Sequence, residues 1–260
     1  MKRLGLLGCG NISKGIVKAI NEGKINFRVT SLFDTNLEKA KELAKDIKPK
    51  PKIAKNIEEF LREVDIVFEG ASQDAVFEYA EKILSKKKEL VIMSVGALVN
   101  ENFFEKLKKI AEKNRVCIYI PSGAILGVDG LKAAKISKCE EVVLTTRKNP
   151  KSFGLKNKKE KIIFEGSAKE AVVKFPRNIN IAATLSLAGI GFKKTKVKII
   201  SDPKVKENIH EVYVRGNFGE FLIRTKNLPS LENPKTSYLA VLSAISILRK
   251  IESSYIQIGT

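Results

Sequence analysis

A short stretch near the N-terminus has the residue types that bind phosphate groups. The apolar run Leu4–Leu7 shows no helical period and leads into Gly8 and Gly10, after which apolar residues recur at helical spacing. In such a strand–turn–helix the first glycine permits a tight turn and the second lets the backbone approach a pyrophosphate, while the N–H groups that open the helix face the anion. We therefore predict a dinucleotide site whose contacts include Gly8, Gly10, Asn11 and Ile12.

The third glycine of the usual G-x-G-x-x-G pattern is absent, and Ser13 stands in its place. That glycine allows close packing of the helix against the strand. We expect the serine to widen this approach slightly and to leave the phosphate cradle intact.

An acidic residue follows near the spacing that such sites use for the ribose. The apolar strand Phe27–Phe33 ends in Asp34, close to the roughly 20-residue separation at which a carboxylate accepts bonds from the adenosine ribose. A carboxylate there repels a 2′-phosphate, which favours NAD over NADP, although Thr35 and Asn36 leave some room for NADP. The alternative is that Asp34 only opens the next helix, where Thr35 and Glu38 form a capping-box pattern.

Strand and helix patterns alternate through the first 120 residues, which predicts an α/β domain with a Rossmann-type parallel sheet covered on both faces. Ligands of such sheets lie beyond the carboxyl ends of the strands. Three such ends, Glu69–Ser72, Ser94–Ala97 and Pro121–Ala124, are candidates to frame the nicotinamide. Ala71 and Ser72 are therefore predicted cofactor contacts, with turn and helix-cap roles as the alternative.

The pattern changes after Pro121. Five shorter strands and two helices predict a second, α+β domain with a mixed or antiparallel sheet and helices on one face. An apolar-faced helix starting near Asn233 is expected to pack on the first domain. We thus predict a dinucleotide-binding domain of residues 1–120, completed by the C-terminal helix at 233–260, and a second domain of residues 121–232.

The chain has a single histidine, His210. Strand alternation places it on the same face as Val212 and Val214, with Glu211 and Tyr213 opposite. One interpretation is a partly buried core histidine with one hydrogen bond. The other is a catalytic group, because hydride transfer from an amino or hydroxy acid requires a side chain that handles a proton near neutral pH.

Composition limits the other possibilities. The 260 residues contain no 18-residue apolar run and only three widely separated cysteines, so we expect a cytoplasmic protein without a disulfide framework or metal site. The formal net charge of +19 comes from lysines at helix ends and loops, which predicts a solvated surface that attracts anionic ligands. A high lysine content with few glutamines is also typical of proteins from hot environments, and a melting temperature in the mesophile range would contradict that hypothesis.

Several motifs in a common order give the chain a resemblance to the archaeal and bacterial L-aspartate dehydrogenases over nearly its whole length. The residues that carry it are GLLGCGNIS at 5–13, EGAS at 69–72, PSGAILG at 121–127, KFPRNINIAATLSLAG at 174–189, SDP at 201–203, NIH at 208–210 and ENPKTS at 232–237. Ser13 departs from the glycine usual in that family.

The resemblance implies an oxidoreductase that converts L-aspartate to iminoaspartate with NAD or NADP and feeds NAD biosynthesis through quinolinate formation. It implies a homodimer whose 121–232 domain carries the dimer sheet and the catalytic cleft. Matched by motif, His210 corresponds to the active-site histidine, and Ala124 and Asn180 correspond to NAD-contacting positions. The candidates for the cations that bind the two substrate carboxylates are Lys174, Arg177 and Lys235, and the sequence does not decide between them.

Two other functions remain alternatives. One is a related two-domain dehydrogenase, similar to homoserine dehydrogenase or dihydrodipicolinate reductase. The more remote one is a non-enzymatic nucleic-acid-binding protein that uses the positive charge. Because the glycine turn, Asp34 and the family motifs agree, we expect neither nucleic acid nor membrane as a partner.

Overall fold

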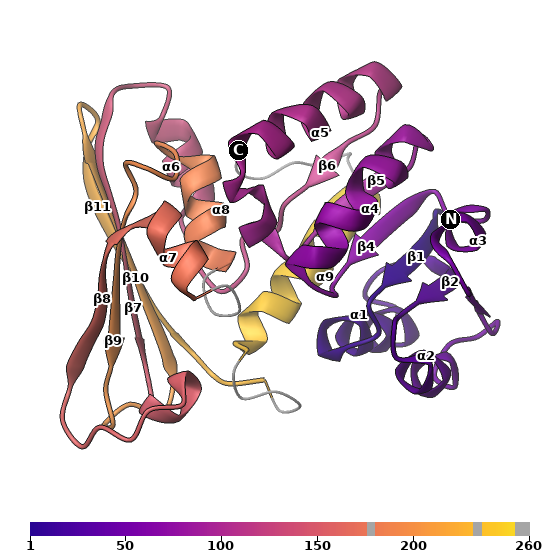
Figure 1. Ribbon diagram of the computed structural model, residues 1–260, viewed down its shortest axis with the longest axis horizontal. Helices are drawn as coiled ribbons and strands as arrows, with labels where there is room; N and C mark the ends of the chain where they lie inside the picture. The colour runs from indigo at the N-terminus through magenta and orange to yellow at the C-terminus, as the bar shows by residue number, and fades with distance from the viewer. Residues whose placement is uncertain (176–179, 231–235, 253–260) are drawn as a thin grey trace. The chain divides into compact units, whose positions relative to one another are not determined.

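The computed structural model describes residues 1–175, 180–230 and 236–252. The chain divides into two compact units. The first comprises Met1–Pro121 together with the described residues from Ala244 onward, and the second comprises the described residues between Ser122 and Ser243. Each unit contains one sheet and its helices (Figure 1).

The first unit is built on a six-stranded parallel sheet with the strand order β3-β2-β1-β4-β5-β6. This doubly wound order confirms the predicted Rossmann-type fold and places its reversal point between β1 and β4. The strands are β1 Arg3–Leu7, β2 Arg28–Phe33, β3 Lys52–Ile53, β4 Ile66–Glu69, β5 Glu89–Ile92 and β6 Ile118–Tyr119.

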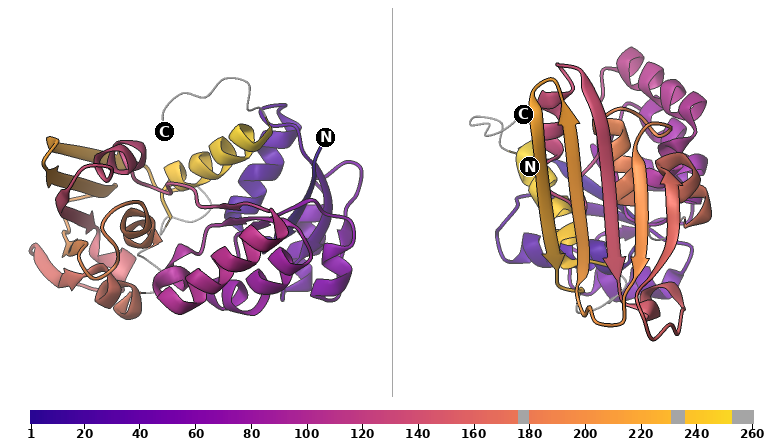
Figure 2. Two further views of the ribbon diagram at one scale, coloured as in Figure 1. Left: turned by 90° about the horizontal axis from the view of Figure 1, so that it is seen from above. Right: turned by 90° about the vertical axis from the view of Figure 1, so that its left-hand side faces the viewer.

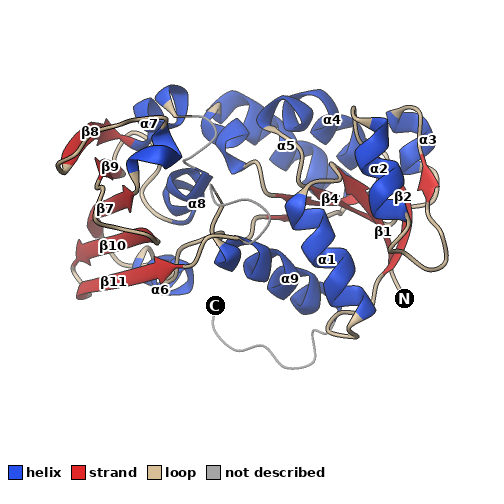
Figure 3. Ribbon diagram, turned by 90° about the horizontal axis from the view of Figure 1, so that it is seen from below, coloured by secondary structure: helices blue, strands red, loops and turns tan. Residues whose placement is uncertain are grey.

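Helices cover both faces of this sheet, with α1 and α9 side by side on one face and α4 and α5 on the other (Figure 3). The polar residues Asn36, Asn56, Ser72 and Asn100 cap four of the helices through their side chains. The elements are α1 Asn11–Asn21, α2 Leu37–Ala44, α3 Ile57–Leu61, α4 Gln73–Ser85, the 3-10 turn η1 Val95–Val99, α5 Glu101–Asn114 and α9 Tyr238–Glu252.

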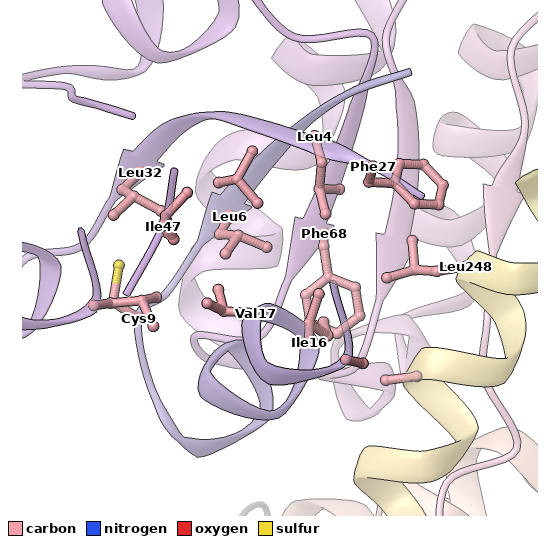
Figure 4. Packing of buried hydrophobic residues seen from close by; sticks show 14 of the residues in the cluster. Leu4, Leu6, Cys9, Ile16, Val17, Phe27, Leu32, Ile47, Phe68 and Leu248 are labelled. Carbon is pink, nitrogen blue, oxygen red and sulfur yellow. The ribbon is translucent and has the colours of Figure 1, made fainter. Parts of the chain in front are cut away.

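The C-terminal helix packs into the core of the first unit. Ala244 and Leu248 of α9 are buried in one cluster with Leu6, Ile16 and Phe68, which belong to β1, α1 and β4 (Figure 4). The predicted start of this helix was too early. It begins at Tyr238, because Ser237 instead forms an isolated β-bridge with Pro229, while Asn233 lies outside the described residues.

The second unit contains a five-stranded sheet with the order β11-β10-β7-β9-β8. Only the β7–β9 pair is parallel, so the prediction of a mixed sheet is confirmed. Its helices lie on one face, and no helix of the described residues lies over the other (Figure 2, right). The elements are α6 Val128–Ala134, β7 Cys139–Lys148, η2 Pro150–Phe153, β8 Lys161–Ser167, α7 Ala168–Lys174, α8 Asn180–Ala188, β9 Lys196–Ser201, β10 Asn208–Gly216 and β11 Gly219–Asn227.

Within the described ranges, none of the helices combines the length and the apolar character needed to cross a bilayer.

Candidate functional site

The glycine turn after β1 is held by close backbone packing. Gly8 has a φ of +91°, and a Cβ atom at this position would lie 2.8 Å from backbone atoms of Ala71 at the end of β4. The Gly8 N–H donates to the carbonyl of Phe33 at 2.8 Å. Both the backbone conformation and the space therefore require glycine, and the turn joins the ends of three neighbouring strands.

Gly10 is the N-cap of α1 and provides no side-chain cap. A Cβ built on Gly10 would meet nothing within 4 Å. Asn11 and Ile12 form the first turn of the helix, where backbone N–H groups have no intrahelical acceptor. An open approach to uncapped helical N–H groups fits a pyrophosphate.

Ser13 has a defined role in the turn. It is buried, and its Oγ donates to the carbonyl of Gly8 at 2.6 Å. The serine that replaces the third glycine thus ties the first helix to the glycine turn.

Asp34 follows β2 and accepts a hydrogen bond at each carboxylate oxygen. The Cys9 N–H donates to Oδ2 and the Asn36 N–H donates to Oδ1, both at 2.7 Å. Asp34 therefore fixes the glycine turn and also opens the loop before α2. The predicted capping box of Thr35 and Glu38 is wrong, because the α2 N-cap is Asn36, whose side chain accepts from the N–H groups of Glu38 and Lys39.

A pocket of about 270 Å³ lies at the carboxyl ends of β1, β2 and β4. This is the reversal point of the strand order, where ligands of doubly wound sheets bind. An acidic side chain at one wall and uncapped N–H groups nearby match the ribose and the phosphates of a dinucleotide. The lining residues include the predicted contacts Gly8, Gly10, Asp34, Ala71 and Ser72, together with Thr35, Lys39 and Tyr79.

Cys9 lies in the glycine turn, but its side chain packs in the core with Leu6 and Val17 (Figure 4). Burial, together with the nearby Asp34 carboxylate, raises the pKa of Cys9 to about 12. The thiol is therefore protonated at physiological pH, and the side chain fills space in the core.

Glu69, at the end of β4, is a carboxylate with only 1% exposure. Its Oε1 accepts from the Ala71 N–H and the Ser94 hydroxyl, both at 2.8 Å, and its Oε2 accepts from the N–H groups of Ser94 and Met93 at 2.9 and 3.2 Å. Burial raises the pKa of Glu69, against the effect of these bonds. Glu69 thus fastens the ends of β4 and β5 beside the pocket, a role that the sequence did not reveal.

Ser72 and the Ser94–Ala97 segment have the cap and turn roles that were the alternative to cofactor contact. Ser72 caps α4 by accepting from the Ala75 N–H at 3.1 Å, while still lining the pocket. Ser94 donates to Glu69, and the following 3-10 turn is buried from Val95 to Leu98.

His210 lies on β10 of the second unit and is 2% exposed. It shares the buried face with Val212 and Val214, as alternation predicted. Thr146, its neighbour in the sheet on β7, places Oγ1 3.1 Å from His210 Nδ1. Burial, and secondarily the positive charge of Lys148, lowers the pKa of His210 to about 3, so the imidazole is neutral at physiological pH.

Ala124 lies close to this histidine. Thr225 pairs with His210 in the sheet, and its hydroxyl contacts the carbonyls of Ala124 and His210, both at 3.4 Å. The Asn227 side-chain amide donates to the Ala124 carbonyl at 2.9 Å. The structure therefore brings together Ala124 and His210, two residues separated by 86 positions.

Lys148 was missed by the sequence analysis. It is the last residue of β7, two positions after Thr146 on the same buried face, and it is 5% exposed. Burial lowers the pKa of Lys148 to about 8. Every second residue of β7 from Val142 onward is buried, and this alternation was the signal that could have found Lys148.

The remaining predicted residues divide into three groups. Asn180 is the first described residue of α8. Lys174 is exposed at the end of α7, with its Nζ 5.8 Å from the centre of the Phe164 ring, outside the polar group around His210. Arg177 and Lys235 lie outside the described residues.

Comparisons with known proteins agree in both halves of the chain. Residues 8–121 match the family described as homoserine dehydrogenase, NAD binding domain, and residues 129–251 match the one described as aspartate dehydrogenase, C-terminal. The dihydrodipicolinate reductase of Paenisporosarcina sp. TG-14, at 14% identity and a TM-score of 0.55 over 97% of this chain and 96% of that one, shares the fold alone.

Relatives also match over the whole or nearly the whole chain. The L-aspartate dehydrogenase of Methanosarcina barkeri is 45% identical over 272 residues, covering 100% of both proteins. The crystal structure of aspartate dehydrogenase from Thermotoga maritima has a TM-score of 0.83 at 33% identity and covers 99% of this chain and 100% of that one. These full-length matches, together with the family match of residues 129–251, show that the chain belongs to the aspartate dehydrogenase family.

Proposed function

We propose that this protein is an L-aspartate dehydrogenase that oxidises L-aspartate to iminoaspartate with NAD, a reaction that supplies NAD biosynthesis. The observation that carries the proposal is the 45% identity to an L-aspartate dehydrogenase over the full length of both chains. A homoserine dehydrogenase is less well supported, because that description matches only residues 8–121, whereas residues 129–251 match aspartate dehydrogenases.

In this proposal residues 1–120 and the C-terminal helix bind the dinucleotide, and residues 121–232 carry the catalytic and dimerisation surfaces. Support comes from the pocket at the β1–β4 reversal point and from its acidic wall at Asp34. We assign the cofactor contacts to Gly8, Gly10, Asn11, Ile12, Asp34, Ala71, Ser72, Ala124 and Asn180. NADP stays a second candidate, and Lys39, which also lines the pocket, is a cation that a 2′-phosphate can approach.

NAD, when bound, supplies the acceptor for the hydride that leaves the α carbon. The α amine must lose a proton as the C=N bond forms. We assign that proton to His210, because its imidazole is neutral at physiological pH and its Nδ1 is already engaged by Thr146. The hydrogen bond at Nδ1 orients the ring and leaves Nε2 for the substrate.

We also propose a homodimer formed through the helix-free face of the five-stranded sheet. Support comes from apolar side chains on that face, where Leu222 is 66% and Ile162 is 48% exposed. Light scattering on the purified protein tests this, and we expect Leu222→Glu to give monomers. Val173→Glu, on an exposed position of α7, is the matched control. A wild-type monomer would contradict the proposal.

Absorbance at the reduced-nicotinamide band tests the activity directly. We expect the signal to rise when the protein is mixed with L-aspartate and NAD, more slowly with NADP, and not with L-homoserine. Turnover of homoserine without turnover of aspartate would overturn the assignment.

A further inference from the structure

The buried face around His210 is unusually polar for the interior of a sheet. Thr146 and His210 are joined by a hydrogen bond, and the Asn208 amide donates to the Ser237 hydroxyl at 3.2 Å. The polar side chains on this face come from three adjacent strands: Thr146 and Lys148 on β7, Asn208 and His210 on β10, and Thr225 and Asn227 on β11.

Lys148 differs from the other members of this group because it carries a charge. Among the described residues, no carboxylate lies within 4.0 Å of its Nζ, and no hydrogen bond satisfies the ammonium. Lys196, on the neighbouring strand β9, shows the usual arrangement, with an exposed side chain and Glu141 at 2.7 Å. Lys148 therefore bears the desolvation cost of burial without the counter-ion that normally offsets it.

An anion bound next to Lys148 would supply the missing counter-ion and offset the desolvation cost of the ammonium. A carboxylate is the anion that fits, since the substrate of the proposed reaction is an amino dicarboxylate and must place its α carbon near His210. We propose that the Lys148 ammonium binds a carboxylate of the substrate and makes the site selective for acidic amino acids. This inference rests on the proposed function.

The position of the charge supports this role. Lys148 lowers the pKa of His210, so the two groups are coupled in the protein without substrate. A carboxylate on Lys148 neutralises the charge that His210 senses and makes the imidazole a better proton acceptor when substrate is present. A pKa of about 8 for Lys148 leaves the ammonium form predominant at pH 7.

The test compares Lys148→Met, Lys148→Arg and a matched control, Lys226→Met. Met has nearly the length of lysine and no charge, and replacing an unpaired buried cation with it does not threaten folding. Lys226 is at the same end of the sheet, on β11, but is exposed. Melting temperature and the KM for NAD monitor folding and the nucleotide site.

For Lys148→Met we expect the KM for L-aspartate to rise about 100-fold, as the loss of a buried charge partner does, with the KM for NAD unchanged within twofold. Lys148→Arg should recover at least tenfold of this loss, and Lys226→Met should leave both constants unchanged. An L-aspartate KM within threefold of wild type in Lys148→Met overturns the inference. An equal effect of Lys226→Met also overturns it, because the loss of any positive charge at this end of the sheet would then explain the rise in KM.

Calorimetry with succinate separates this inference from the proposed function. Succinate carries both carboxylates and no amine, so its binding to the NADH-loaded protein requires no turnover. Binding by wild type but not by Lys148→Met supports the role of Lys148 even if L-aspartate is not oxidised. Equal succinate binding by the two proteins, or no binding by either, rejects it.

Discussion

The two units of this protein use ionisable side chains in opposite ways. In the nucleotide-binding unit, Asp34 and Glu69 are carboxylates whose oxygens accept bonds from neighbouring backbone N–H groups. In the second unit, Lys148 is a buried ammonium and His210 a buried imidazole, and Thr146 is the only hydrogen-bond partner of these two side chains among the described residues.

This contrast separates positioning groups from ligand-binding groups. A carboxylate saturated by backbone donors fixes the loops that carry it, so its removal should lower stability or distort a binding loop. A buried polar side chain whose donors or acceptors have no protein partner can instead bind a ligand that enters the site. Substitutions in the second site should therefore affect the reaction more than the fold.

The largest expected effect is that of His210→Ala. If the imidazole accepts the amine proton, kcat for L-aspartate should fall about 1000-fold, within the range for general acid–base catalysis. Glu211→Ala, on the opposite face of the same strand, is the control. NADH binding followed by fluorescence should change less than twofold. Retention of most of the rate would remove His210 from the mechanism.

Glu69→Gln should lower the free energy of unfolding by about 3 kcal/mol, because the amide group cannot accept from all four donors that surround the carboxylate. Chemical denaturation measures this. Glu105→Gln, an exposed glutamate on α5, is the control. If the two variants are equally stable, the buried carboxylate does not hold the strand ends.

Acid should destabilise the protein through His210. Its folded pKa, about 3, lies below the ordinary value of 6.5, so the unfolded chain binds more protons between these values and stability falls as pH falls. From pH 6.5 to 5.0 the loss should be about 2 kcal/mol. Glu69, with its raised pKa, acts in the opposite direction. Denaturation of wild type and His210→Ala in parallel isolates the histidine, and identical pH profiles would refute this account.

The smallest expected effect is on cofactor choice. Asp34→Ser should raise the KM for NAD about tenfold and reduce the preference for NAD over NADP, because the ribose loses a charged acceptor and a 2′-phosphate loses a repulsive neighbour. Asp46→Ser, an exposed change in the same unit, is the control. An unchanged ratio of the two KM values would show that Asp34 serves only the loop.

The sequence predicted those features that depend on local pattern. The strand–turn–helix at Gly8, the position of Asp34 and the inward face of His210 all follow from periodicity or short spacing. Helix α6 was not predicted, since it is short, follows a glycine at its N-cap, Gly127, and is interrupted by Gly130. The grouping of Lys148 with His210 and the bond from Asn227 to Ala124 depend on pairing between distant segments, which one sequence does not reveal.

Helix α9 has a consequence for protein engineering. Its first residues belong to one unit, while Ala244 and Leu248 complete the apolar core of the other. A chimera that exchanges the nucleotide unit between relatives must therefore transplant the second half of this helix along with Met1–Pro121. An N-terminal fragment cut at Pro121 would expose the apolar side chains that Ala244 and Leu248 cover and would be prone to aggregation.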